Sequence, residues 1–102
     1  MLATFTVIPL GVPDGAKHLI AEALKIVDAS GLSYQLGPMG TTLEGESGEV
    51  MQVVMQCHKR LLELAPRVMT SILIDERPGH TGRLKGKVQD VEELLGKPLR
   101  RE

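Results

Sequence analysis

Residues 32–46 of the chain are LSYQLGPMGTTLEGE. The turn residues 37–40 separate two short runs, residues 32–36 and 41–46, that are rich in strand-forming side chains. Glycine and proline favour a tight reversal of the chain, so we expect the two runs to pair as an antiparallel hairpin. Helical patterns lie on both sides of this hairpin, and their placement predicts how the whole chain folds.

A strand and a helix are predicted before the hairpin. Residues 2–8 are β-branched or apolar and stop at Pro9, as expected of a strand. Asp14 is the predicted N-cap of a helix that starts at Ala16 and has its apolar residues at helical spacing. Gly31 follows as the expected stop. The first part of the chain therefore reads as a strand–helix unit.

A second helix and strand are predicted after the hairpin. Ser47 can cap a helix whose apolar stripe includes Cys57 and which ends before Pro66. Residues 67–77 are strand-forming, and residues 87–95 show a last short helix that stops at a glycine. The chain thus repeats the strand–helix pattern and adds a helical tail.

The resulting order, β-α-β-β-α-β, predicts an α+β ferredoxin-like sandwich. In that topology an antiparallel four-stranded sheet has its first and third strands in the centre and two helices on one face. The other face stays open. At 102 residues the chain is long enough for one core, so we expect a single domain over residues 1–102 with a short C-terminal helix.

Composition narrows the class of protein. A formal net charge of −1 argues against nucleic-acid binding, which needs a concentrated basic face. No apolar run approaches the length of a membrane span, and residues 1–10 lack the basic start of a signal peptide. Cys57 is the single cysteine, so no intrachain disulfide can form. We therefore expect a cytoplasmic protein that binds neither nucleic acid nor membrane.

The open face of the predicted sheet carries a polar patch. Alternation places Thr42 and Glu44 on this face, with Thr6 beside them and Gln35 on the neighbouring strand. A carboxylate shielded there is costly unless it is paired, so Glu44 could hold a cationic or amine-bearing ligand. Alternatively, Glu44 is solvated or forms a salt bridge across a subunit interface. A sheet that is half covered by helices is often covered by another subunit.

Several segments of the chain resemble the small thiamine-binding protein family. The matching segments are VIPLG at 7–11, SGLSY at 30–34, GPMGTTLEGE at 37–46, RVMT at 67–70, DER at 75–77 and KV at 87–88. The resemblance implies a ferredoxin-like homodimer or dimer of dimers that binds thiamine or its hydroxymethylpyrimidine half, without known chemistry on it. It carries Thr42 and Glu44 over as ligand contacts. Less directly, it implies ligand contacts from residues that could equally be turn or core residues, namely Tyr34, Gln35, Met39 and Thr41.

The chemistry of thiamine suits such residues. Its thiazolium ring is permanently cationic, and its aminopyrimidine ring carries hydrogen-bond donors and acceptors. Glu44 could accept from the amino group or pair with the positive ring, while Thr6 and Thr42 complete the hydrogen bonding. Aromatic side chains are scarce, so Met39 could pack against a ring in their place.

Other chemistry-bearing residues give weaker signals. The three histidines, His18, His58 and His80, lack metal-ligand spacing, and Cys57 on the apolar stripe is expected to be a buried structural thiol. Arg83, Lys85 and Lys87 could bind an anion such as a phosphorylated form of the ligand, or form a solvated basic loop. We therefore expect no catalytic residue, no metal site and no cofactor other than the ligand itself.

These observations favour a non-enzymatic binding protein for thiamine or a related pyrimidine, acting as carrier, buffer or sensor. The alternative is an oligomeric structural or regulatory interaction protein whose open face serves only for assembly. An enzyme acting on a phosphorylated pyrimidine is a third hypothesis, for which the sequence offers no nucleophile–base pair.

Overall fold

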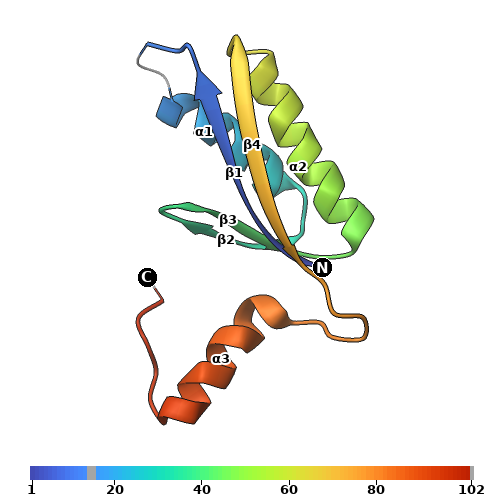
Figure 1. Ribbon diagram of the computed structural model, residues 1–102, viewed down its shortest axis with the longest axis vertical. Coiled ribbons are helices and arrows are strands. Elements are labelled where there is room, and N and C mark those ends of the chain that lie inside the picture. Colours follow the sequence, from blue (N-terminus) through green and yellow to red (C-terminus); the bar gives the residue numbers. More distant parts are fainter. Residues whose placement is uncertain (14–15, 102) are drawn as a thin grey trace.

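The computed structural model describes residues 1–13 and 16–101 and has the predicted element order. The strands are β1 (Leu2–Leu10), β2 (Ser33–Gly37), β3 (Gly40–Glu44) and β4 (Arg67–Asp75), and the helices are α1 (Ala16–Ala29), α2 (Ser47–Leu62) and α3 (Arg83–Leu95). All strand pairs are antiparallel in the order β2-β3-β1-β4 (Figure 1). The ferredoxin-like prediction is thereby confirmed, with β1 and β3 in the centre of the sheet. Asp14, the predicted cap of α1, lies outside the described residues.

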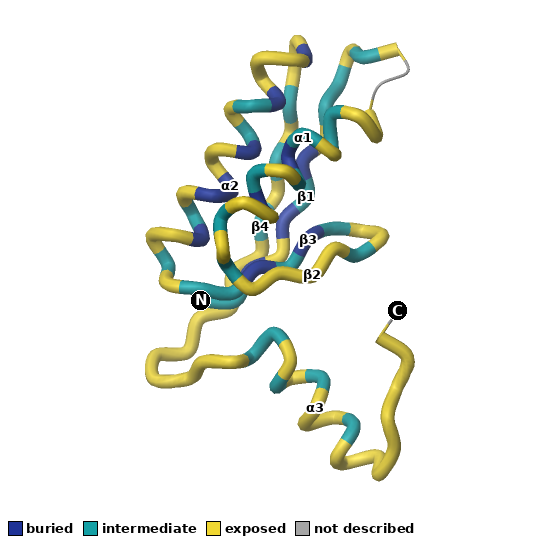
Figure 2. Tube along the Cα trace, turned by 180° about the vertical axis from the view of Figure 1, so that it is seen from behind, coloured by how far each residue is buried: buried dark blue, intermediate teal, exposed yellow. Residues whose placement is uncertain are grey.

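The core lies between the sheet and the helices α1 and α2. Phe5 and Leu43 point to this side, as the alternation predicted, and are at most 3% exposed. Val27 of α1 and Leu61 of α2 meet them there, each with no exposed surface. Figure 2 shows the buried positions gathered along β1, β3 and the inner sides of these two helices. The opposite face of the sheet is not covered by either helix.

The first strand is longer than predicted. It continues through Pro9 to Leu10, whereas the sequence pattern stopped it at residue 8. β1 pairs with β3 only as far as Phe5, and beyond that residue it pairs with β4 alone. A strand with one free side tolerates proline, which lacks the backbone N–H.

The junction between β3 and α2 also differs from the prediction. β3 ends at Glu44 rather than at residue 46, and the N-cap of α2 is Glu46 rather than Ser47. Glu46 has an extended backbone, and its Oε1 accepts a hydrogen bond from the Gly48 N–H at 3.2 Å. Because a carboxylate can fill the cap position, the helix starts at Ser47 itself.

The last helix begins four residues earlier than predicted, at Arg83 instead of Lys87, and β4 ends at Asp75 instead of Arg77. The residue before α3, Gly82, has a left-handed backbone (φ 68°) and supplies no side-chain cap. The sequence around residue 83 therefore contains no local start signal. Within the described residues, no helix is both long and apolar enough to cross a membrane.

Helix α3 stands apart from the sandwich. None of its residues is buried, and in Figure 1 it lies beyond the end of the sheet. The radius of gyration is 15.0 Å, whereas a compact domain of this length has about 13 Å. The molecule is accordingly elongated, with extents of 47 × 28 × 21 Å. Two places are therefore accessible to a ligand: the open face of the sheet and the junction between the sheet and α3.

Candidate functional site

The strand register places the polar residues of the open face in rows. Glu44 of β3 and Asp75 of β4 both pair with Leu2 of the strand between them. The next row on this face joins Gln35, Thr42, Thr4 and Leu73 across all four strands. One row further, Thr6 pairs with Ser71, and their hydroxyls are 2.7 Å apart. The predicted residues Glu44, Thr42, Gln35 and Thr6 therefore share one face.

Glu44 reaches from the end of β3 to the start of α3. Its Oε2 accepts from the backbone N–H of Arg83 at 2.7 Å, and its Oε1 accepts from that of Leu84 at 3.2 Å. These are two of the N–H groups that a helix leaves without internal partners, and they carry the positive end of the helix dipole. Glu44 thus caps α3 from a strand 39 residues earlier in the sequence.

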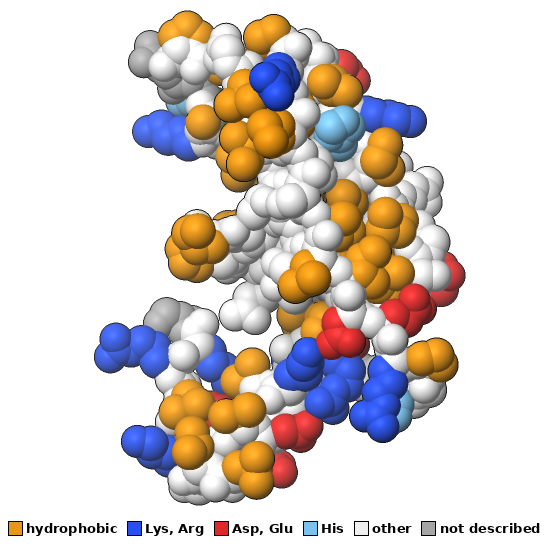
Figure 3. All heavy atoms as spheres, viewed as in Figure 1, with side chains coloured by type: hydrophobic (Ala, Val, Ile, Leu, Met, Phe, Trp, Pro, Cys, Tyr) orange, Lys and Arg blue, Asp and Glu red, His pale blue; other side chains and the backbone are white. Residues whose placement is uncertain are grey.

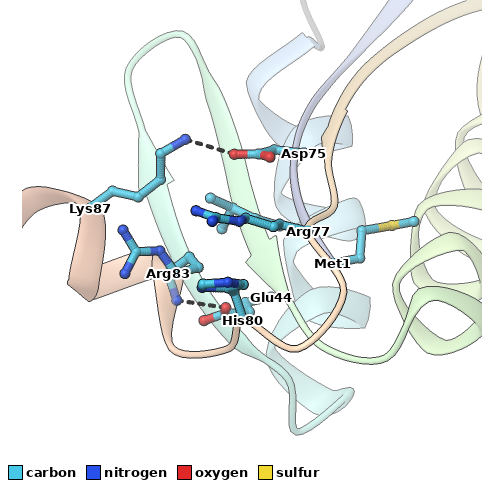
Figure 4. A pocket seen from close by; sticks show the side chains of 8 residues that line it. Met1, Glu44, Asp75, Arg77, His80, Arg83 and Lys87 are labelled. Atoms are coloured by element: carbon cyan, nitrogen blue, oxygen red, sulfur yellow. Dashed lines mark hydrogen bonds and ion pairs between the residues drawn. The ribbon is translucent and has the colours of Figure 1, made fainter.

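A cavity of about 250 Å³ lies beside Glu44, between the end of the sheet and α3. We call it the Glu44 cavity; its charged and polar lining consists of Glu44, Asp75, Arg77, His80, Arg83 and Lys87. Figure 4 shows these side chains converging from β3, β4, the following loop and α3. Figure 3 shows basic and acidic side chains gathered where the sandwich meets α3.

A tight turn brings two of these residues together. The N–H of His80 donates to the carbonyl of Arg77 at 3.0 Å, with Pro78 and Gly79 between them. Gly79 has φ +84°, and proline followed by a glycine of positive φ is typical of a type II turn. The turn therefore fixes the backbones of Arg77 and His80 at one side of the Glu44 cavity.

Two of the basic side chains that line the Glu44 cavity form ion pairs. Lys87 Nζ lies 2.7 Å from Asp75 Oδ2, and Arg83 Nη2 lies 2.9 Å from Asp90 Oδ2. The hydrogen bond and charge of Lys87 lower the pKa of Asp75 below its usual value. Among the described residues, Arg77 makes no ion pair. The cavity is lined by three cationic side chains, a histidine and two carboxylates, so its charge is positive on balance.

A second cavity, of about 510 Å³, lies at the other end of the hairpin. Three of the predicted site residues line it, namely Thr6, Met39 and Thr41, together with apolar side chains of α1 such as Ile20 and Leu24. Met39 is 86% exposed at the hairpin tip, whereas Thr41 is buried on the helix side of the sheet. We call this the apolar cleft. Glu44 and Gly40 are four residues apart on β3, about 13 Å along the strand, so the two cavities are separate.

Tyr34 lies on the helix side of the sheet, away from Glu44. It pairs with Leu43 of the core, and its hydroxyl donates to Asp28 Oδ1 of α1 at 2.7 Å. That hydrogen bond raises the pKa of Tyr34 above its usual value. The structure therefore brings Glu44, Thr42, Gln35 and Thr6 onto one face. Thr6 also lines the apolar cleft, together with Met39 and Thr41, and Tyr34 is separated from Glu44.

Cys57 is the buried structural thiol that its place on the apolar stripe predicted. It has no exposed surface, its Sγ donates to the Ala23 carbonyl at 3.4 Å, and burial raises its pKa to about 11. His58 is hydrogen-bonded through Nδ1 to Thr70 at 2.7 Å. Within residues 1–13 and 16–101, no three His, Cys, Asp or Glu side chains gather closely enough to hold a metal ion.

Sequence reasoning did not assign Arg77 and His80 to the site. The Arg77-Pro78-Gly79-His80 segment does carry a turn signal, because proline followed by glycine favours a type II turn. That signal places residues 77 and 80 close together. Only the packing of α3 against Glu44 places them at the same cavity as Asp75.

Comparison with known proteins identifies the relatives of this chain. Residues 3–92 match the model of a family described as "Thiamine-binding protein". A UPF0045 protein of Mycobacterium bovis is 40% identical over 99 residues, which cover 96% of this chain and 97% of the relative. Another UPF0045 protein, from Bacillus subtilis, is 32% identical over 100 residues, which cover 92% of this chain and 96% of that relative.

Solved structures have the same fold. A hypothetical protein of Methanocaldococcus jannaschii superposes with a TM-score of 0.83 at 27% identity, over 90% of this chain and 95% of the other. A Thermotoga maritima protein, provisionally assigned to thiamine biosynthesis or salvage, superposes with a TM-score of 0.77 at 30% identity, over 88% and 96% of the two chains.

Proposed function

Since this chain belongs to the thiamine-binding protein family, we propose that it binds thiamine or its hydroxymethylpyrimidine half as a cytoplasmic carrier, buffer or sensor. In this proposal the ligand is bound without chemical change. The Cys57 thiol is buried, with its pKa raised to about 11, and is therefore poorly placed to serve as a nucleophile.

The observation that supports the proposal most strongly is the carboxylate of Glu44 at the edge of the open face. A carboxylate has about four acceptor positions, and two of them are taken by the N–H groups of Arg83 and Leu84. The remaining lone pairs can accept from the amino group of an aminopyrimidine. Thr42 stands two residues away on the same face and offers a hydroxyl to the ring.

The charges around Glu44 indicate which half of thiamine belongs there. Arg77 and Arg83 line the same cavity, so a permanently cationic thiazolium would be opposed by like charges. The aminopyrimidine half is neutral at pH 7 and meets no such cost. We therefore assign the aminopyrimidine to Glu44 and the thiazolium to the neighbouring row of threonines.

We further propose that the protein works as a homodimer or a dimer of dimers. Ile8, Met69 and Leu73 on the open face are 49%, 51% and 71% exposed, an unusual density of large apolar side chains for a surface in contact with water. A second copy lying on this face would bury these residues. It would also shield the threonine rows from water and strengthen their hydrogen bonds to a ligand.

The proposal is tested by calorimetric titration and thermal unfolding with thiamine and with hydroxymethylpyrimidine. We expect binding of at least one compound and a dose-dependent rise of the unfolding midpoint, because a ligand of the native state stabilises it. Glu44→Gln should weaken binding by about tenfold or more, the usual effect of losing a hydrogen bond to a charged group. The variant should still fold, since the glutamine oxygen can accept one of the helix N–H groups.

Glu49→Gln is the matched control. Glu49 is exposed in the first turn of α2 and lines neither the Glu44 cavity nor the apolar cleft, so this variant should bind like the wild type. Equal affinities for the Glu44→Gln and Glu49→Gln variants would contradict the assigned role of Glu44. Absence of binding and of any midpoint shift with both compounds would overturn the binding function.

A second candidate function, an oligomeric interaction protein, is favoured by one observation. The carboxylate of Glu44 is bonded to the protein's own backbone at α3, as a purely structural residue would be. If neither compound binds while the open face mediates assembly, this second function replaces the first.

A further inference from the structure

The Glu44 cavity combines two kinds of recognition group within a small volume. One is the carboxylate of Glu44, which accepts hydrogen bonds; the other is the group of cationic side chains Arg77, Arg83 and Lys87. Figure 4 shows the side chain of Arg77 between the Lys87–Asp75 pair and Glu44. An acceptor and a set of donors that carry positive charge therefore face the same space.

The cations of this cavity are not all neutralised. Lys87 is paired with Asp75, and Arg83 is paired with Asp90 outside the cavity. Glu44 is directed at backbone N–H groups rather than at a basic side chain. Arg77, which the type II turn holds beside His80, has no ion-pair partner within the described residues. The Arg77 guanidinium is thus available to an anion, and guanidinium groups bind phosphate through paired N–H donors.

We propose that the Glu44 cavity takes a phosphate ester of hydroxymethylpyrimidine in preference to the unphosphorylated compound and to thiamine. This inference rests on the proposed function and names the form of the ligand. In the ester, the amino group and the phosphorylated methylene are on adjacent ring carbons. The amino group donates to Glu44 while the phosphate oxygens accept from Arg77 and Lys87, which matches the neighbouring acceptor and donors of the cavity.

The size of the cavity supports the same ligand. Its volume of about 250 Å³ is below the roughly 300–1,000 Å³ that usually encloses a drug-sized molecule. One substituted ring suits this space better than the two linked rings of thiamine. The charge agrees with this choice, because a cavity that is positive on balance favours a phosphate over a thiazolium cation.

The inference is tested by calorimetric titration of the full chain with hydroxymethylpyrimidine, its monophosphate, thiamine and inorganic phosphate. We expect the monophosphate to bind about tenfold or more tightly than the free alcohol. Arg77→Gln should abolish that preference by lowering the affinity for the monophosphate to about that for the free alcohol. Lys87→Gln, a second variant, should reduce the preference, and circular dichroism checks that each variant is folded.

Arg67→Gln provides the control. Arg67 is exposed at the opposite end of β4, far from the Glu44 cavity. Its substitution removes the same charge as Arg77→Gln, so this variant should retain the full preference. Equal affinities of the wild type for the alcohol and its monophosphate would overturn this inference while the proposed function stands. A preference that survives in Arg77→Gln would overturn the assigned site. Binding of none of the three organic compounds would overturn the proposed function as well, even if inorganic phosphate binds.

Discussion

Glu44 connects the central strand β3 to the start of α3. Its backbone belongs to a central strand, where alternation alone places it on the open face. Its two oxygens accept from the first N–H groups of α3, whose N-cap position is a glycine without a side chain. A carboxylate at a helix N-terminus interacts favourably with the positive end of the helix dipole. Glu44 is therefore held in position before any ligand arrives.

Cys57 makes a contribution to stability that depends on pH. Burial raises the pKa of its thiol from an ordinary value near 9.0 to about 11. A raised pKa in the folded state means that the native protein holds the proton more strongly than the unfolded chain does. The stability linked to this thiol is fully present below about pH 9 and is lost as the pH rises towards 11.

We expect the free energy of unfolding of the wild type to fall between pH 9 and 11 by on the order of 2 kcal/mol more than that of Cys57→Ala. Urea unfolding at a series of pH values measures this difference. Below pH 9 the two curves should run parallel, with Cys57→Ala less stable because of the cavity it leaves. Parallel curves up to pH 11 would show that Cys57 is less buried than the structure has it.

Helix α3 depends on a residue outside itself. Its N-cap position is a glycine without a side chain, and none of its residues is buried against the sandwich. Hydrophobic packing therefore adds little to its stability, and a short isolated helix is marginal in water. The Glu44 cap and the Lys87–Asp75 ion pair are the contacts that tie the start of α3 to the sheet.

Removal of this cap should loosen α3 selectively. In Glu44→Ala, two N–H groups lose their acceptor, a change that typically costs about 1 kcal/mol. We expect amide hydrogen exchange in residues 83–95 to become several-fold faster, while the exchange of amides in α1, α2 and β1 is unchanged. Hydrogen-exchange mass spectrometry reads these segments separately.

Glu46→Ala is the control for this experiment. Glu46 is two residues further along the chain and also caps a helix, but that helix is α2. The variant should therefore speed exchange at the start of α2 and leave α3 as it is. If both variants affect α3 alike, the cap is not the contact that holds it.

Large apolar side chains are exposed on two parts of the molecule, the open face of the sheet and α3. Besides the open face, α3 carries Val91, Leu94 and Leu95, which are 47%, 88% and 57% exposed. Figure 3 shows apolar side chains on both the sandwich and α3, on either side of the charged junction. Two unpartnered surfaces in one elongated chain support the proposed assembly of copies.

Light scattering coupled to size-exclusion chromatography tests this assembly. We expect the wild type to elute with a mass of two or four chains. Leu73→Glu, on the edge strand β4 of the open face, should shift the mass towards one chain. Leu62→Glu is the control: Leu62 is 47% exposed on α2, away from the open face, so this variant should keep the mass of the wild type. A wild type of single-chain mass would contradict the proposal.

The sequence by itself determined the elements, their order and the faces of the strands. The hairpin at residues 37–40, the helical stripes and the alternation through Phe5, Leu43 and Glu44 are local patterns, and local patterns depend only on neighbouring residues. The errors lie at element ends. Pro9 was tolerated because β1 loses one neighbour there, and α2 is capped by Glu46 rather than Ser47.

Only the tertiary structure decided which predicted residues meet. The same strand-forming pattern that placed Tyr34 in the hairpin could not reveal its bond to Asp28, nor separate Met39 and Thr41 from Glu44. The Glu44 cavity joins residues 44, 75, 77, 80, 83 and 87, and the start of α3 is set by a side chain 39 residues away. Contacts across such separations depend on how strands and helices pack, and no periodicity in the sequence records them.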